Sequence, residues 1–173
     1  MIKIRTENLR EIAPSLMVEQ KILLTGTVYT ARDAAHKEFA KIIEDGGELP
    51  IAIKDAVIYY AGPTPAKPNE VIGSCGPTTS CRMDPYAPAL LDMGLAAMIG
   101  KGQRNKQVVD AIKRNKAIYL CAIGGAGALY NQCIKDAEVA AFPELGCESV
   151  KKLYVEDFPL IVAIDSSGGN IFN

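Results

Sequence analysis

The sequence is poor in the residues that hold metal ions. It has one histidine, His36, and no tryptophan. Its five cysteines are scattered, and no two have the C-x-x-C spacing that is typical of a zinc or iron–sulfur site. Their odd number argues against a disulfide framework, so we interpret them as reduced thiols, mostly small buried apolar side chains. They are Cys75, Cys81, Cys121, Cys133 and Cys147. We therefore expect no metal centre held by this chain alone.

The chain also lacks an excess of charge of either sign. Nineteen basic residues balance twenty acidic ones, for a formal net charge of −1. This balance argues against nucleic acid or an anionic membrane surface as a partner. No apolar run approaches the roughly 20 residues that span a bilayer. The first residues have no hydrophobic signal-peptide core, so we expect a cytoplasmic protein.

Internal repeats, low-complexity tracts and long linkers are missing too, so residues 1–173 are predicted to form a single domain. Strand-like and helix-like segments alternate, which predicts an α/β fold. A capping box is expected at Thr30–Asp33, and Asp84-Pro85 resembles the start of a short helix. Strands are expected at 21–29, 55–60, 95–99, 117–123, 150–155 and 159–165, and a polar amphipathic helix at 103–114.

Three segments carry more polar chemistry than a scaffold needs. In the first, residues 25–37, Arg32 is predicted in the first turn of a helix. Free N–H groups at a helix start suit an anion, and an arginine there suggests that a carboxylate compensates its charge. His36 lies four residues on, hence on the same face. The alternative is an exposed Arg32–Asp33 pair and a satisfied structural histidine.

The second segment, residues 73–84, is a constrained loop in which three hydroxyl residues precede Arg82. Thr78, Thr79 and Ser80 can present hydroxyls to a small polar ligand, and Arg82 can grip a carboxylate with two N–H groups. The alternative, which the residues leave open, is that the hydroxyls cap the following helix.

The third segment is Gly100-Lys101-Gly102, where the flanking glycines let the backbone approach a ligand and leave the lysine unshielded. A fourth stretch, Gly124–Gly127, lacks the full dinucleotide-binding pattern because Tyr130 stands where a third small residue belongs. Close packing of a strand on a helix accounts for it better. Three cations and a hydroxyl, without an electrophile, suit a small dicarboxylate.

Several segments in this order resemble the beta subunit, or C-terminal domain, of class I fumarate hydratases and L(+)-tartrate dehydratases. The most specific are TARDAAHK, at residues 30–37, and GPTTSCRMD, at residues 76–84. The resemblance extends over nearly the whole chain. The matching segments are Leu24–His36, Tyr60–Pro63, Gly76–Asp84, Gly100–Gly102, Gly124–Ala126 and Asp157–Pro159.

The resemblance implies a three-layer β/β/α swivelling domain with mixed sheets. It also implies a [4Fe–4S] cluster held by cysteines of an alpha subunit and not by this chain. By position, Arg32, Arg82 and Lys101 bind the substrate carboxylates with Thr79, and Thr78 is the proton-transferring hydroxyl. Asp33 and His36 would orient Arg32 without contacting the substrate themselves. The resemblance gives no role to Cys81.

The implied activity is reversible hydration of fumarate to (S)-malate, in a heteromer such as α2β2 with a cluster-bearing alpha subunit. Dehydration of tartrate to oxaloacetate needs the same cations, so the motifs leave it open. A third hypothesis is a non-catalytic domain that binds small dicarboxylates without a partner.

Overall fold

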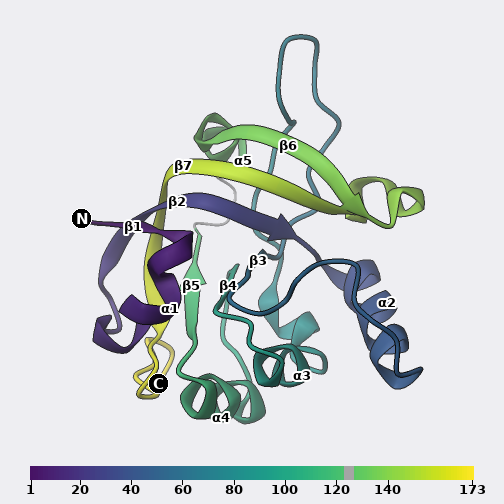
Figure 1. Cartoon of the computed structure of the whole chain (residues 1–173). Coiled ribbons are helices and arrows are strands. Elements are labelled where there is room, and N and C mark those ends of the chain that lie inside the picture. The colour runs from purple at the N-terminus through teal and green to yellow at the C-terminus, as the bar shows by residue number, and fades with distance from the viewer. Residues whose placement is uncertain (123–126) are drawn as a thin grey trace.

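Seven strands form one mixed β-sheet in the part of the chain that the computed structural model describes, residues 1–122 and 127–173 (Figure 1). The strand order is β1-β2-β3-β4-β5-β7-β6. The strands are β1 (Ile2–Arg5), β2 (Lys21–Thr30), β3 (Val57–Tyr59), β4 (Ala97–Gly100), β5 (Ile118–Cys121), β6 (Ile134–Ala141) and β7 (Val150–Ile164). The α-helices are α1 (Leu9–Ile12), α2 (Asp33–Glu44), α3 (Ala87–Asp92), α4 (Lys106–Asn115) and α5 (Gly127–Tyr130).

An additional antiparallel pairing of β2 with β7 curls the sheet on itself. Strands β2, β3, β4 and β5 are successive parallel neighbours, and β7 pairs with both β5 and β2. The 15-residue length of β7 lets it reach all of its partners, with β6 on its first half. Along β2, buried and partly buried residues alternate, which puts Ile22, Leu24 and Val28 on the inner side.

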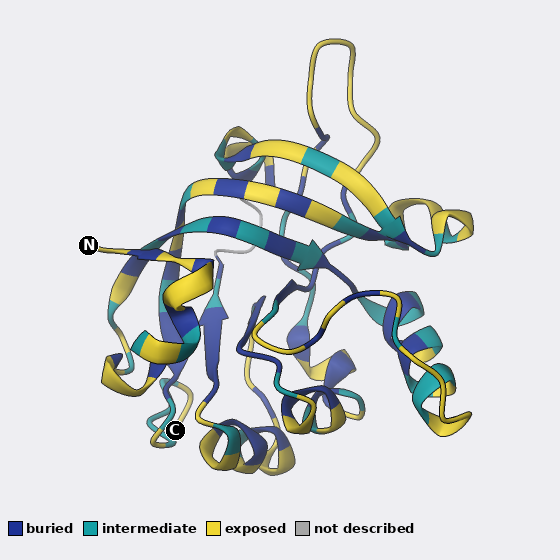
Figure 2. Ribbon diagram, viewed as in Figure 1, coloured by how far each residue is buried: buried dark blue, intermediate teal, exposed yellow. Residues whose placement is uncertain are grey.

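Two hydrophobic clusters lie on opposite faces of the β3-β4-β5 layer. Val57 and Tyr59 belong to one cluster, on the inside of the curled sheet, which we call the inner cluster. Ile58 belongs to the other, under the helices, which we call the outer cluster. This separation follows from the period-two alternation of side chains along a strand. Figure 2 shows the same strands buried while the helices expose their outer faces. The expected α/β fold with mixed strand directions is confirmed.

Two expected helix starts are wrong. Thr30 is the last residue of β2, and its hydroxyl accepts a hydrogen bond from Lys151 N at 3.1 Å, so it does not cap α2. The helix begins at Asp33 after Arg32, whose side chain makes no capping bond. Asp84 does not open a helix with Pro85 either, because α3 begins only at Ala87 and the Asp84 carboxylate binds Arg104. In both cases a distant partner takes the group that the local pattern assigned to a cap.

The C-terminal part also differs from the expectation of two strands at 150–155 and 159–165. They are one continuous strand, β7, which includes Pro159. Its neighbour β6 had no clear sequence signal, because most of its residues are exposed or only partly buried. Pairing with β7, and not burial of its own side chains, holds β6 in the sheet.

Candidate functional site

The predicted site residues gather at the carboxyl ends of neighbouring parallel strands. Arg32 follows β2 and Lys101 follows β4. Just beyond β3, Tyr60 O accepts a hydrogen bond of 2.8 Å from Thr78 N. Since β2, β3 and β4 are adjacent and parallel, their carboxyl ends lie at one edge of the sheet. The sheet topology therefore brings together segments that are far apart in the sequence.

Arg32 is held between two carboxylates, and its side chain is 29% exposed. Its NH2 group donates to Asp33 Oδ2 at 3.3 Å. Its buried Nε lies 3.4 Å from Glu148 Oε1, at ion-pair distance but without hydrogen-bond alignment. The expected carboxylate compensation is present, and Asp33 supplies part of it. Glu148 escaped the sequence analysis, since it lies 116 positions away in the chain and only folding brings it to Arg32.

Arg82 joins Asp33 to Thr78. Its Nε donates to Asp33 Oδ1 at 3.2 Å, and its NH2 group donates to the Thr78 hydroxyl oxygen. Asp33 thus contacts both arginines, one with each carboxylate oxygen. Because Thr78 Oγ1 accepts from Arg82, the hydroxyl's own hydrogen remains available for another acceptor. This arrangement links a hydroxyl to a half-exposed guanidinium that keeps further N–H groups.

Lys101 is fixed through its backbone. Its N–H donates to Ser80 Oγ at 3.0 Å, and its carbonyl accepts from Ser80 N at 2.9 Å. Thr79 forms an isolated parallel bridge with Lys101. Gly100 allows this approach, because a Cβ there would lie 1.9 Å from Ser80 Oγ. The Ser80 hydroxyl therefore holds the lysine segment and does not cap a helix; neither η3 (Ser80–Met83) nor α3 has a side-chain cap at its start.

His36 is fully buried beneath the site. Its Nδ1 lies 2.9 Å from Arg32 O, so the ring contacts the backbone of Arg32 and not its guanidinium. Nε2 has no hydrogen-bond partner, and the ring packs edge-on against Phe39 and Tyr60. Burial lowers the pKa of His36 from 6.5 to about 4; the hydrogen bond with the Arg32 carbonyl opposes this, and the nearby Arg104 charge adds a smaller lowering.

A buried ion pair under the site was missed by the sequence analysis. Arg104 Nε donates to Asp84 Oδ1 at 2.6 Å, and both side chains are buried. Burial lowers the pKa of Arg104, but Tyr60, Asp84 and Tyr119 outweigh it and raise the pKa on balance, so the guanidinium stays charged. Position 104 was assigned to a polar helix, and nothing in the local sequence distinguishes it from an exposed arginine.

Two further predictions concern residues near this edge. Cys81 is exposed, and no contact gives it a role. Of the Gly124–Gly127 stretch, only Gly127 lies within the described residues. A Cβ on Gly127 would lie 2.7 Å from Gly76 N, and Gly127 O accepts from Cys75 N at 3.2 Å. The glycine at 127 therefore permits close packing, here against the loop that leads to Thr78.

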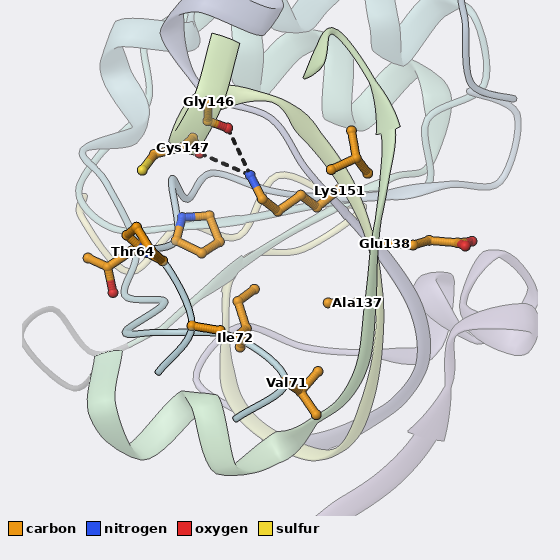
Figure 3. Close-up of a pocket in the computed structure, with 12 residues that line it drawn as sticks. Thr64, Val71, Ile72, Ala137, Glu138, Gly146, Cys147 and Lys151 are labelled. Atoms are coloured by element: carbon orange, nitrogen blue, oxygen red, sulfur yellow. Dashed lines mark hydrogen bonds between the residues drawn. The ribbon is translucent and has the colours of Figure 1, made fainter. Parts of the chain in front are cut away.

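A hollow between residues 63–72 and β6 has none of Arg32, Arg82 and Lys101 in its lining. It has a volume of about 380 Å³ and is lined by Pro63–Ala66, Val71, Ile72, 137–139, Gly146, Cys147 and Lys151. Figure 3 shows Lys151 reaching the carbonyls of Gly146 and Cys147, at 3.1 and 3.4 Å. Burial lowers the pKa of its ammonium group. The walls are mostly apolar, so this hollow offers a dicarboxylate less than the Arg32–Arg82–Lys101 cluster does.

Metal ligands do not converge in the described part of the chain. Within residues 1–122 and 127–173, no three His, Cys, Asp or Glu side chains gather in a way that could hold a metal ion. The five cysteines are free; Cys75 is buried, while Cys81 and Cys147 are exposed. The donor set of these residues does not fit an iron–sulfur cluster. Within the same residues, no helix is both long and apolar enough to cross a membrane.

The fold and the site together define an α/β domain that presents Arg32, Arg82, Lys101 and a threonine hydroxyl at one sheet edge. The fumarase C-terminus family model matches residues 1–173. The chain belongs to that family, which confirms the resemblance seen in its motifs.

Similar proteins include fumarate hydratases and a tartrate dehydratase subunit. The chain is 44% identical to the anaerobic class I fumarate hydratase of Escherichia coli strain K12, over 90% of this chain and 29% of that protein. It is 38% identical to fumarate hydratase 2 of Leishmania major, over 96% of this chain and 30% of that protein. It is 37% identical to a putative L(+)-tartrate dehydratase subunit beta of Methanocaldococcus jannaschii, over 91% of this chain and 84% of that protein. The chain thus spans less than a third of these fumarate hydratases but most of the beta subunit.

Proposed function

We propose that this chain is the beta component of a [4Fe–4S] hydro-lyase that reversibly hydrates fumarate to (S)-malate. The observation that carries the proposal is the assembly of Arg32, Arg82, Lys101 and the Thr78 hydroxyl at one sheet edge, in a member of the fumarase C-terminus family. A cluster-bearing alpha component supplies the rest of the site, in an α2β2 heteromer. Support for a separate component comes from the beta-subunit relative, most of whose length this chain covers.

In this function the chain binds and orients the substrate. Arg32, Arg82 and Lys101 bind its two carboxylates, with Thr79 beside them. Asp33 bridges the two guanidiniums and keeps their separation, and it leaves further N–H groups of Arg82 for a carboxylate. His36 supports the Arg32 backbone from below.

The Thr78 hydroxyl transfers the proton in this proposal. A threonine hydroxyl is a weak base at neutral pH and needs activation. The adjacent Arg82 cation favours the oxygen in its deprotonated form, because an opposite charge within hydrogen-bond distance stabilises an anion. A base from the alpha component completes the activation. We propose that the electrophile also comes from the alpha component; within the described residues of this chain, no three His, Cys, Asp or Glu side chains converge.

Dehydration of tartrate is the second candidate, favoured by the relative named as a tartrate dehydratase subunit beta. Anaerobic purification of the chain with its co-purifying partner, followed by assays with fumarate, malate and tartrate, separates the two activities. The chain alone should contain no iron and show no turnover. Stoichiometric iron with turnover in the single-chain sample would contradict the two-component proposal. Tight dicarboxylate binding by the chain alone, with no partner and no turnover, would favour the binding-domain hypothesis.

Arg82→Lys should be costly although it keeps the positive charge. One ammonium group cannot contact Asp33, Thr78 and a substrate carboxylate with the planar geometry of a guanidinium. Losing charge-assisted hydrogen bonds costs roughly 1.5–3 kcal/mol, or about one to two decades in kcat/KM. Steady-state kinetics of the reconstituted complex measure this loss. Arg114→Lys, an exposed change in a pair with Asp92, is the matched control. Unchanged kinetics in Arg82→Lys would remove Arg82 from the site.

A further inference from the structure

The buried pair of Arg104 and Asp84 connects the two segments that carry Arg82 and Lys101. Asp84 comes two residues after Arg82, and Arg104 comes three residues after Lys101. Asp84 Oδ1 accepts from Arg104 Nε at 2.6 Å, and Oδ2 accepts from Asn105 N at 2.9 Å. One carboxylate therefore binds both the side chain and the backbone of the segment that follows Lys101.

Aromatic side chains enclose the Arg104 guanidinium. Its carbon lies 5.2 Å from the Tyr60 ring centroid and 4.9 Å from that of Tyr119, and NH2 donates to the Tyr60 hydroxyl at 3.2 Å. The Tyr119 hydroxyl in turn donates to Gly102 O at 2.7 Å and lies 2.8 Å from Ser80 Oγ. Every partner of this network belongs to, or directly contacts, the 80–84 and 101–105 segments.

Stability alone does not account for a charged group here. A buried ion pair contributes little net stability compared with apolar side chains of similar size, because both charges lose their hydration. What the pair adds is direction: planar donors and acceptors fix the two backbones at a defined separation. A site that places cations around a small ligand needs that separation.

Lys101 is the residue that depends most on such backbone placement. Arg32 and Arg82 are oriented by carboxylates at their side chains, whereas Lys101 makes no ion pair within residues 1–122 and 127–173. Its position follows from the backbone bonds to Ser80 and from the loop that Asp84 holds. We infer that Asp84 and Arg104 are positioning residues, which set the place of Lys101 relative to Arg82. The inference rests on the proposed function for its catalytic consequence.

The test replaces the pair without leaving a buried charge unpaired. The double variant Asp84→Asn/Arg104→Met keeps an oxygen acceptor for Asn105 N and a linear side chain between the tyrosines. In the active complex, KM for malate should rise about tenfold while kcat changes less, as expected when substrate binding in the ground and transition states weakens equally. In a Lys101→Ala background the same double change should add almost nothing to KM, because the two effects act through one group.

Leu91→Ala is the matched control, since it opens a cavity in the outer cluster at a residue with no side-chain bond to the site. It should lower the midpoint of thermal unfolding and leave KM unchanged. Independent, additive effects of Lys101→Ala and the double variant would overturn the inference and assign the pair to stability.

A second measurement does not depend on activity. Amide hydrogen exchange of the full chain reports the bond from Lys101 N to Ser80 Oγ. In the double variant, the Lys101 amide should exchange at least several-fold faster than in wild type, relative to amides of β7. If the wild-type complex proves inactive, the proposed function fails, and the exchange data still decide the positioning role. An unchanged Lys101 exchange rate would refute it.

Discussion

Replacing Thr78 by alanine should lower kcat of the reconstituted complex about 10²–10⁴-fold, the usual contribution of general acid–base catalysis. The variant removes the hydroxyl oxygen to which Arg82 donates, so the site loses the proposed proton-transferring atom and an acceptor for the guanidinium. KM should rise less than kcat falls, because Arg32, Arg82 and Lys101, the proposed carboxylate-binding cations, remain. Steady-state kinetics with malate, under anaerobic conditions, give both constants.

Thr78→Ser separates the hydroxyl from the methyl group. It keeps the oxygen, so it should retain part of the rate that Thr78→Ala loses. Ser15→Ala, which removes an exposed hydroxyl bonded to Ile12 O, should leave both constants unchanged. If the alanine and serine variants behaved alike and only weakened binding, a role in proton transfer would be wrong.

The free energy of unfolding should fall by about 3 kcal/mol between pH 7 and pH 4 through His36 alone. The folded protein holds His36 neutral, with its pKa lowered from 6.5 to about 4 by burial. As pH falls below 6.5, the unfolded chain takes up a proton that the folded chain refuses, so protonation favours unfolding. The stability is fully present above pH 6.5 and is lost progressively as pH falls toward 4. Denaturant titrations at half-unit pH intervals measure the slope.

The assignment is direct, because His36 is the chain's one histidine. His36→Asn keeps a donor toward Arg32 O and removes the titration, so its stability should vary little between pH 7 and pH 5. Asp92 and Asp165 do not interfere in that range, because their hydrogen-bonding partners hold their carboxyl pKa values below 3.8. An equal pH slope in wild type and His36→Asn would place the titrating group elsewhere.

Local patterns in the sequence predicted the elements whose signal lies within a few neighbouring residues. The alternation in β2 and the amphipathic spacing of α4 belong to this kind, and both elements lie where they were expected, within a few residues. The motif around Thr78 and Arg82 likewise pointed to a polar site, and the resemblance then gave each residue a role that remains a proposal.

Helix starts and sheet edges were predicted less well, because distant partners compete for the same groups. Thr30 fits a cap in the local sequence, yet the backbone of β7 takes its hydroxyl. Asp84 fits an N-cap as well, but an arginine twenty positions later binds it more strongly. Strand β6 is held in the sheet by its pairing with β7. Its own residues therefore need almost no hydrophobic pattern, and the sequence gives little sign of a strand there.

The sequence by itself determined the α/β class and the family, and it supplied the residues of the proposed carboxylate site, because each depends on composition, short-range periodicity or a contiguous motif. Only the tertiary structure decided that Asp33 bridges both arginines, that Glu148 lies against Arg32, and that a buried Arg104–Asp84 pair joins the lysine and arginine segments. These contacts arise where parallel strands end side by side, and a linear pattern carries no record of which strand ends will be neighbours.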